Sequence, residues 1–182
     1  MKHLVGAPKT AEAKAKPRLP HDYIVALGEL ADNEENRRFL NGSNDEASIV
    51  TWLMIRHATE DDEVLIYSKA LSPLFYAEIL RAASIQPLKC RFRIVLDDKE
   101  GMKVVKALPV EIQSHVDCRY LLEPEGGHFL VFDDAFRYEI KDHHDELSVV
   151  CNFSERETAQ KLRSGFERRW EKSASCQVLL DS

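Results

Sequence analysis

The sequence GGHFLVFDDAFRYEI, residues 126–140, decides the fold class of this 182-residue chain. Two apolar segments, 128–132 and 136–140, stand on either side of the short stretch Asp133-Asp134-Ala135. Apolar segments that are joined by so few residues are typical of two antiparallel strands in a hairpin. We therefore predict a hairpin here, which interrupts an otherwise simple alternation of strands and helices.

The segments around the hairpin alternate between strand and helix patterns. Short apolar runs predict strands at 63–68, 91–96, 116–122 and 147–153. Helical spacing of apolar residues predicts helices at 46–59, 73–84 and 99–108, and a long final helix after Ser154. This order predicts an α/β fold in which a mixed β-sheet carries helices on both faces. No G-x-G-x-x-G sequence follows the strand at 63–68, which argues against a dinucleotide-binding fold.

The final helix has both a start signal and a core signal. Ser154 precedes Glu157 by three residues, which predicts a capping box with Ser154 as the N-cap. Apolar residues at helical spacing then form one stripe, which we expect to be buried: Ala159, Leu162, Phe166 and Trp170.

Residues 1–20 are expected to form a flexible basic tail, and residues 21–182 a single domain. The tail mixes Ala, Lys and Pro and carries a net charge of +4, so the rest of the chain carries −10. Within the domain, we predict a short strand or a turn of helix at residues 23–30 and a loop at residues 32–45. An acidic body repels a phosphate backbone, so nucleic-acid contact is expected only through the tail or a local basic patch.

The composition is that of a cytoplasmic protein without a membrane span. Apolar residues make up 44% and charged residues 31%, and no apolar run approaches the roughly 20 residues that cross a bilayer. The four cysteines show no C-x-x-C spacing, so we expect reduced thiols that pack as small apolar groups. His143-His144 has no second ligand pair at a useful spacing, so we expect no metal site and no cofactor.

The order of elements and two short motifs resemble one half of the phospholipase D superfamily over residues 48–170. In that family a strand opens with His-x-Lys, an Asp follows seven residues after the His, and an Asn-containing segment precedes the last helix. His128 matches the nucleophile position and Asn152 matches the Asn position. Leu130 occupies the lysine position, and Ala135 the aspartate position.

The resemblance implies a chemistry for which this chain retains only part of the residues. In the family the His attacks phosphorus while the Lys neutralises the nonbridging oxygens, and both project from one face of a strand. Leu130 cannot supply that charge, so the resemblance implies a degenerate single-motif member. Arg137 and Lys141 are the candidate replacement cations for binding.

The sequence therefore predicts a non-catalytic phospholipase D-like module that acts by binding a phosphate-containing ligand, a nucleic acid or a protein partner. Because intact single-motif relatives pair about a two-fold axis, the resemblance implies a homodimer. Two alternatives stay open. One is an active phosphodiesterase or nuclease dimer that uses His128, and the other is a regulatory or assembly subunit whose basic tail docks an acidic partner.

Overall fold

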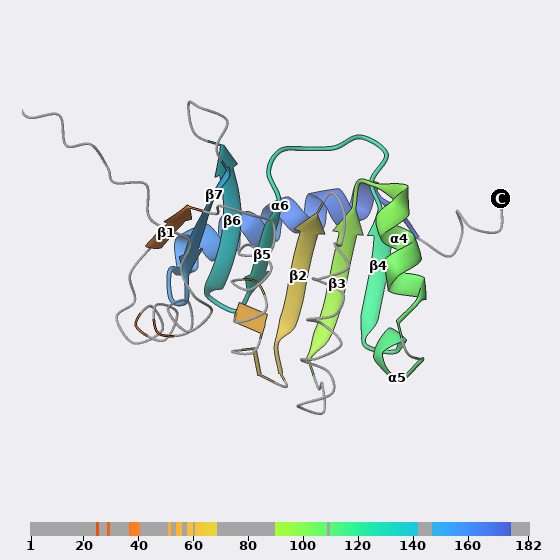
Figure 1. Cartoon of the computed structure of the whole chain (residues 1–182), viewed down its shortest axis with the longest axis horizontal. Helices are drawn as coiled ribbons and strands as arrows, with labels where there is room; N and C mark the ends of the chain where they lie inside the picture. Colours follow the sequence, from red (N-terminus) through yellow and green to blue (C-terminus); the bar gives the residue numbers. More distant parts are fainter. Residues whose placement is uncertain are drawn as a thin grey trace, which may run out of the picture.

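Eight strands form one mixed sheet in the part of the chain that the computed structural model describes (Figure 1). Their order across the sheet is β1-β7-β6-β5-β2-β3-β4-β8. The described residues are 25, 29, 37–40, 51, 54–55, 58–59, 61–68, 90–108, 110–141 and 147–175. The predicted α/β class with a mixed sheet is confirmed.

Three neighbouring strands of the sheet are parallel: β2 (Glu63–Ser68), β3 (Arg91–Leu96) and β4 (Val116–Tyr120). The four middle residues of β2 are all buried, as expected for a strand that is covered on both faces. The short β8 (Ala174–Ser175) pairs antiparallel with β4. The strands predicted at 63–68 and 91–96 are confirmed with their predicted bounds.

The remaining strands pair antiparallel on the other side of β2. They are β5 (Phe129–Phe132), β6 (Ala135–Lys141), β7 (Leu147–Asn152) and β1 (Arg37–Leu40). The predicted hairpin is confirmed, but Phe132 pairs with Ala135, so its turn has two residues rather than three. Asp133 has a φ of 43°, a left-handed conformation that two-residue hairpin turns require.

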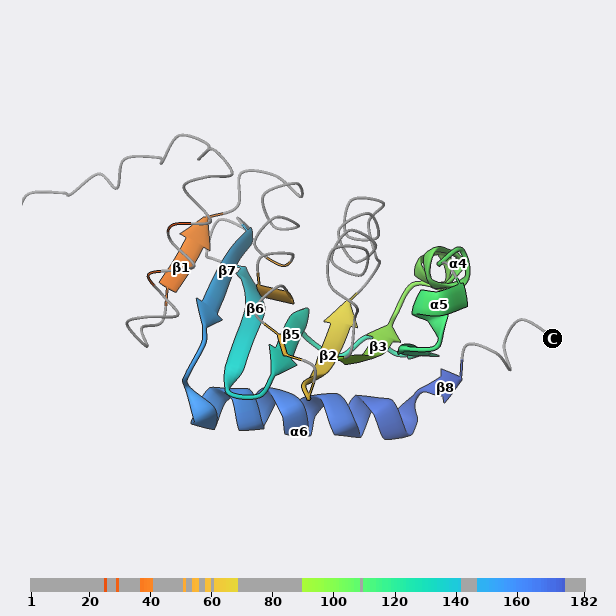
Figure 2. The same ribbon diagram turned by 90° about the horizontal axis from the view of Figure 1, so that it is seen from below.

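Helices cover both faces of the sheet, as predicted. On one face lies α6 (Arg156–Lys172), whose predicted stripe is confirmed because Ala159, Phe166 and Trp170 are buried and Leu162 packs against them (Figure 2). The opposite face carries α4 (Lys99–Lys106) and α5 (Val110–Gln113). Met102 of α4 packs into the apolar core on that face.

The capping box predicted for α6 is wrong. The N-cap residue is Glu155, and its side chain makes no capping hydrogen bond. Instead, Asn152 Oδ1 accepts hydrogen bonds from the backbone N–H groups of Ser154 and Glu155, at 2.7 and 2.8 Å. An Asn side chain that bonds to the backbone two residues on mimics a turn, and here it leads the chain from β7 into α6.

Other predictions differ from the structure or lie outside its described part. Strand β1 shows that the loop predicted over residues 32–45 is wrong at residues 37–40, and the rest of that range lies outside the described residues. Helix α5 and strand β8 were not predicted. Val25 and Glu29 are helical, as are Thr51, Met54 and Ile55 in the predicted helix 46–59. The tail at 1–20, the helix at 73–84 and His143-His144 lie outside the described residues.

Candidate functional site

His128 lies directly before β5, at the sheet edge where β2 ends, since Phe129 pairs with Tyr67. Its backbone carbonyl accepts a hydrogen bond of 2.9 Å from the N–H of Glu139 on β6. Its ring nitrogen Nδ1 lies 2.9 Å from Oε2 of the same Glu139. Because an ionised carboxylate can only accept, Nδ1 carries the hydrogen and Nε2 of the neutral ring presents a lone pair.

Arg137 is joined to His128 through the same carboxylate. Arg137 and Glu139 stand two residues apart on β6, so both project from one face of the sheet. Arg137 Nη2 donates to Glu139 Oε1 at 2.8 Å, while Nε of this 6% exposed residue has no hydrogen-bond partner. Glu139 therefore bridges a cation and an imidazole with its two oxygens, and the three groups together carry no net charge while the imidazole is neutral.

The environment of Glu139 keeps its carboxylate ionised. Burial acts to raise the pKa of Glu139, but the hydrogen bond from His128 and the charge of Arg137 outweigh it. The pKa of Glu139 therefore lies below its ordinary value. An ionised Glu139 at neutral pH is what orients the ring of His128.

Leu130, at the lysine position of the resemblance, is a core residue with 1% exposure. It pairs with Ile66 of β2 on one side and with Arg137 of β6 on the other. Directly opposed residues in an antiparallel pair have Cβ atoms about 5 Å apart. The cation directly opposite this position, Arg137, is therefore on the neighbouring strand, and it is already bound to Glu139.

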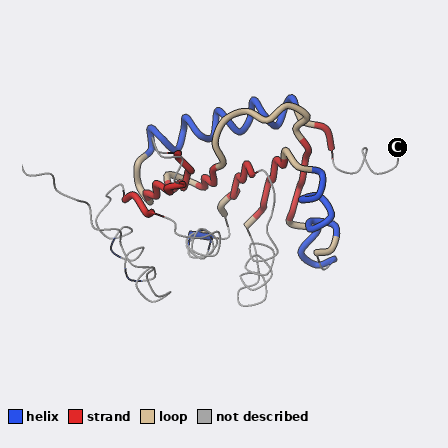
Figure 3. Tube along the Cα trace, turned by 45° about the horizontal axis from the view of Figure 1, so that its top comes forward, coloured by secondary structure: helices blue, strands red, loops and turns tan. Residues whose placement is uncertain are grey.

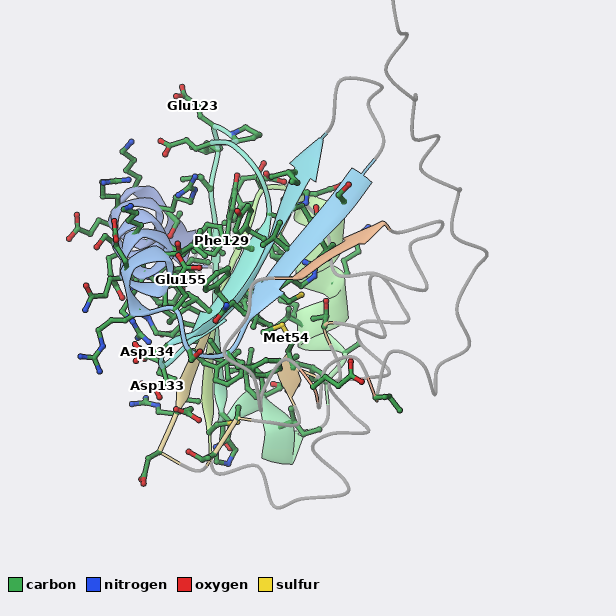
Figure 4. The ribbon with its side chains drawn as sticks, turned by 90° about the vertical axis from the view of Figure 1, so that its left-hand side faces the viewer. Met54, Glu123, Phe129, Asp133, Asp134 and Glu155 are labelled. Atoms are coloured by element: carbon green, nitrogen blue, oxygen red, sulfur yellow. The ribbon has the colours of Figure 1, made fainter. Side chains whose placement is uncertain are left out.

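The structure separates Asn152 from His128. Strand β7 runs from Leu147, which pairs with Lys141, to Asn152, which pairs with Phe136 near the hairpin turn. Asn152 thus lies near the edge of the sheet that carries the turn, where its side chain forms the entry to α6. Figure 4 shows the two edges of the sheet, with Asp133 and Asp134 of the turn far from Glu123 near the opposite edge. Lys141 ends β6, and its side chain lies outside the described part of the chain.

Tyr67 connects His128 to the loop that precedes it. The Tyr67 ring meets the His128 ring edge-on, with centroids 6.0 Å apart. Its hydroxyl accepts a hydrogen bond from the backbone N–H of Glu125 and donates one to Asp97 Oδ2, both at 2.9 Å. The guanidinium of Arg169 on α6 lies over the same ring, 4.6 Å from its centroid. The sheet edge at His128 therefore contacts α6 as well as β6.

The cations on α6 are largely engaged with acidic side chains or backbone carbonyls. Arg156 bonds to Asp134 at 3.2 Å, Lys161 to Glu157 at 2.6 Å, and Lys172 to Glu125 at 2.6 Å. Arg163 and Arg169 donate to backbone carbonyls. A phosphate backbone that approaches α6 would have to compete with these partners.

The described residues hold no group of three His, Cys, Asp or Glu side chains that is arranged to bind a metal ion. Cys90, Cys118 and Cys151 are free and buried, and burial raises the pKa of Cys90 to about 11 and that of Cys151 to about 12. These three cysteines are thus packing residues, as predicted. Of the helices described, none has the length and apolar character of a membrane span.

Glu139 is the residue that the sequence analysis missed. It stands opposite His128 in the hairpin because the turn consists of Asp133 and Asp134 alone. The three-residue turn predicted from the sequence pairs His128 with Ile140 instead. The preference of hairpins for two-residue turns is the signal that would have identified Glu139 as the neighbour of His128.

Comparison with known proteins places this arrangement in a structural class. Neither the models of protein families nor the sequences of curated proteins match this chain. Two similar solved structures are Nuc from Salmonella typhimurium, a phospholipase D family member, and NucT from Helicobacter pylori. Each has a TM-score of 0.56 and 14% identity, and the match covers 78% of this chain and 98% of the other.

A third similar structure is TrmBL2, an archaeal chromatin protein described as showing a novel mode of DNA binding. Its TM-score is 0.61 at 15% identity, and the match covers 85% of this chain. This chain spans 60% of the length of TrmBL2. The likenesses to Nuc and NucT show that the fold of this chain resembles that of a phospholipase D family member.

Proposed function

We propose that this chain is a non-catalytic, single-motif phospholipase D-like module that acts by binding. The observation that carries the proposal is the burial of Leu130, which fills the lysine position with a core side chain. A preorganised donor to a developing oxyanion contributes about 3–4 kcal/mol, or roughly a hundredfold to a thousandfold in rate. Arg137 does not replace it, because Glu139 holds the guanidinium and neutralises its charge.

We propose nucleic acid as the partner class. In support, the structural neighbours include a chromatin protein described by its DNA binding, although a shared fold alone does not fix a function. Broad electrostatic attraction to nucleic acid is not expected, because residues 21–182 carry a net charge of −10. Binding is therefore expected through a few local cations, and it should weaken less steeply with salt than binding through a wide basic face.

The experiment that tests this partner is fluorescence anisotropy of labelled single- and double-stranded DNA between 50 and 200 mM salt. Binding that persists with a shallow dependence on salt supports a local contact, because each neutralised phosphate contributes about 0.9 to the slope on duplex DNA. The same titration with residues 1–20 removed separates the basic tail from the domain. Absence of binding to either form of DNA at 50 mM salt would rule the proposed partner out.

We also propose that the module is a homodimer that associates near the sheet edge at His128. The charge of −10 on residues 21–182 of each copy should not prevent it, because exposed charges are screened beyond about 8 Å at physiological salt. Light scattering coupled to gel filtration at tens of micromolar tests this state. A mass near one 20.9 kDa chain would contradict it.

The second candidate function is an active phosphodiesterase that uses His128. A specific observation favours it: Glu139 holds Nδ1 of His128, so Nε2 is the nitrogen available to attack. Turnover of a phosphodiester that disappears in His128→Ala would establish this function. Arg137→Lys would then separate a role in binding the phosphoryl oxygens from a role in positioning Glu139.

A further inference from the structure

Residues 121–128, here called the strap, connect β4 to β5 across the ends of two other strands. Because β3 and β2 lie between β4 and β5 in the sheet, the strap must pass over both (Figure 1). Figure 3 shows it as a long tan arc that runs beside α6. It thus overhangs the carboxyl ends of the parallel strands, the edge at which open α/β sheets bind ligands.

The strap has little apolar anchorage of its own. Leu121 is buried at its start, and the N–H of Leu121 donates to the carbonyl of Leu96 at 2.7 Å. The five exposed strap residues follow: Leu122, Glu123, Pro124, Gly126 and Gly127. Leu122 is 71% exposed, so burial of apolar surface does not hold the middle of the strap down.

Glu125 makes the contacts that fasten the middle of the strap. Its N–H donates to the Tyr67 hydroxyl at 2.9 Å, and its carboxylate bonds to Lys172 at 2.6 Å. Its backbone carbonyl accepts from Arg169, through Nε at 3.2 Å and also through Nη2. Two partners of Glu125 belong to α6 and one to β2, so this single residue closes the strap onto two rigid elements.

Arg169 is held in place independently of the strap. Its Nη1 donates to the carbonyl of Gly165 one turn earlier in α6, at 2.8 Å. Its guanidinium lies over the rings of Tyr67 and Phe129, 4.6 and 5.5 Å from their centroids. A side chain fixed in this way keeps its position when the strap moves away, and it can receive the strap again.

The two glycines at the end of the strap have different properties. Gly126 has a φ of +74°, which glycine adopts without strain, so it is suited to act as a hinge. Gly127 lies against β6, because a Cβ at this position would come within 2.9 Å of the Glu139 carbonyl oxygen. Movement of the strap therefore ends at Gly126, and His128 beyond it stays paired with Glu139.

We propose that residues 122–126 form a lid, with the contact between Arg169 and Glu125 as its latch. Opening releases the hydroxyl of Tyr67, whose ring lies next to that of His128. A segment that is fastened by a few polar contacts and lacks buried apolar side chains opens at a small fraction of the global free energy of unfolding. That the lid regulates ligand access to the His128 site rests on the proposed function, whereas the opening itself does not.

Hydrogen exchange of the full-length chain, resolved by peptide mass spectrometry, tests the latch. Arg169→Gln should speed exchange of the Glu125 amide by about 10- to 100-fold, the value of a hydrogen bond from a charged donor. Arg168→Gln is the matched control, because Arg168 is exposed, adjacent and equally charged. Amides of β3 and of the first turns of α6 should keep their protection, which distinguishes lid opening from global unfolding.

Two further measurements distinguish opening of the lid from general destabilisation of the Arg169→Gln variant. Tyr67→Phe keeps the ring under Arg169 but removes the acceptor of the Glu125 N–H, and it should also speed exchange of the strap. Nitration of Tyr67 by tetranitromethane reports access, since Tyr67 is fully buried while the strap is closed. It should proceed faster in Arg169→Gln than in Arg168→Gln. Equal strap exchange and equal nitration in wild type, Arg169→Gln and Arg168→Gln would overturn the lid, whether or not the protein binds DNA.

Discussion

Replacing Arg137 with Leu should destabilise the protein by about 3–5 kcal/mol, because the carboxylate of Glu139 would remain buried without its cation. The structure sets this magnitude. Arg137 Nη2 lies 2.8 Å from Glu139 Oε1, and the two side chains are only 8% and 17% exposed. A solvent-exposed pair at the same distance would contribute about 1 kcal/mol or less.

The assay is urea denaturation of four proteins at pH 7: wild type, Arg137→Leu, Glu139→Leu, and the double variant. Urea is preferred because guanidinium would screen the charges under test. The double variant should lose less than Arg137→Leu alone, because no charge is left unpaired, and the cycle yields the coupling energy. A loss below about 1 kcal/mol for Arg137→Leu, with no coupling, would refute the account of a buried, bridging Glu139.

Three other predictions concern stability. Trp170→Ala should cost about 3–5 kcal/mol in the same urea assay, because Trp170 is buried, contacts the guanidinium groups of Arg93 and Arg119, and stacks on Phe166. An unchanged midpoint would place it in solvent. Asp133→Val should destabilise by about 1–2 kcal/mol, whereas Asp133→Gly should be tolerated, because φ is 43° there; equal effects would contradict this reasoning. As the pH falls from about 5 to 3, wild type should lose more stability than Glu139→Gln. The lowered pKa of Glu139 contributes stability that is present above the ordinary Glu value near 4.3 and is lost when the carboxylate is protonated. Parallel pH curves for the two proteins would count against this reasoning.

The central elements were predictable because their own residues carry the signal. Strands β2 and β3 are apolar runs that match their buried environment, and the α6 stripe has helical spacing. Strand β1 carries no such pattern, since Arg37 and Arg38 open it. It is a strand because β7 offers an edge with which to pair, and such tertiary context cannot be derived from four residues.

The candidate site was predicted in part because its geometry depends on register. A shift of one residue in a hairpin moves every side chain to the opposite face, so the length of the turn decides which residue meets His128. Arg137 was singled out as a cation from its type, but its place beside Leu130 follows only from the two-residue turn. Asn152 matched a motif by position, yet its side chain serves the entry to α6.

The central claim is that the buried Leu130 leaves this fold without phosphodiesterase activity. The most direct measurement is hydrolysis of bis-p-nitrophenyl phosphate and of single- and double-stranded DNA by the purified full-length chain, without added metal, with His128→Ala as the control. We predict that both substrates stay uncut and that wild type and His128→Ala are indistinguishable. Turnover by wild type that vanishes in His128→Ala would contradict the account.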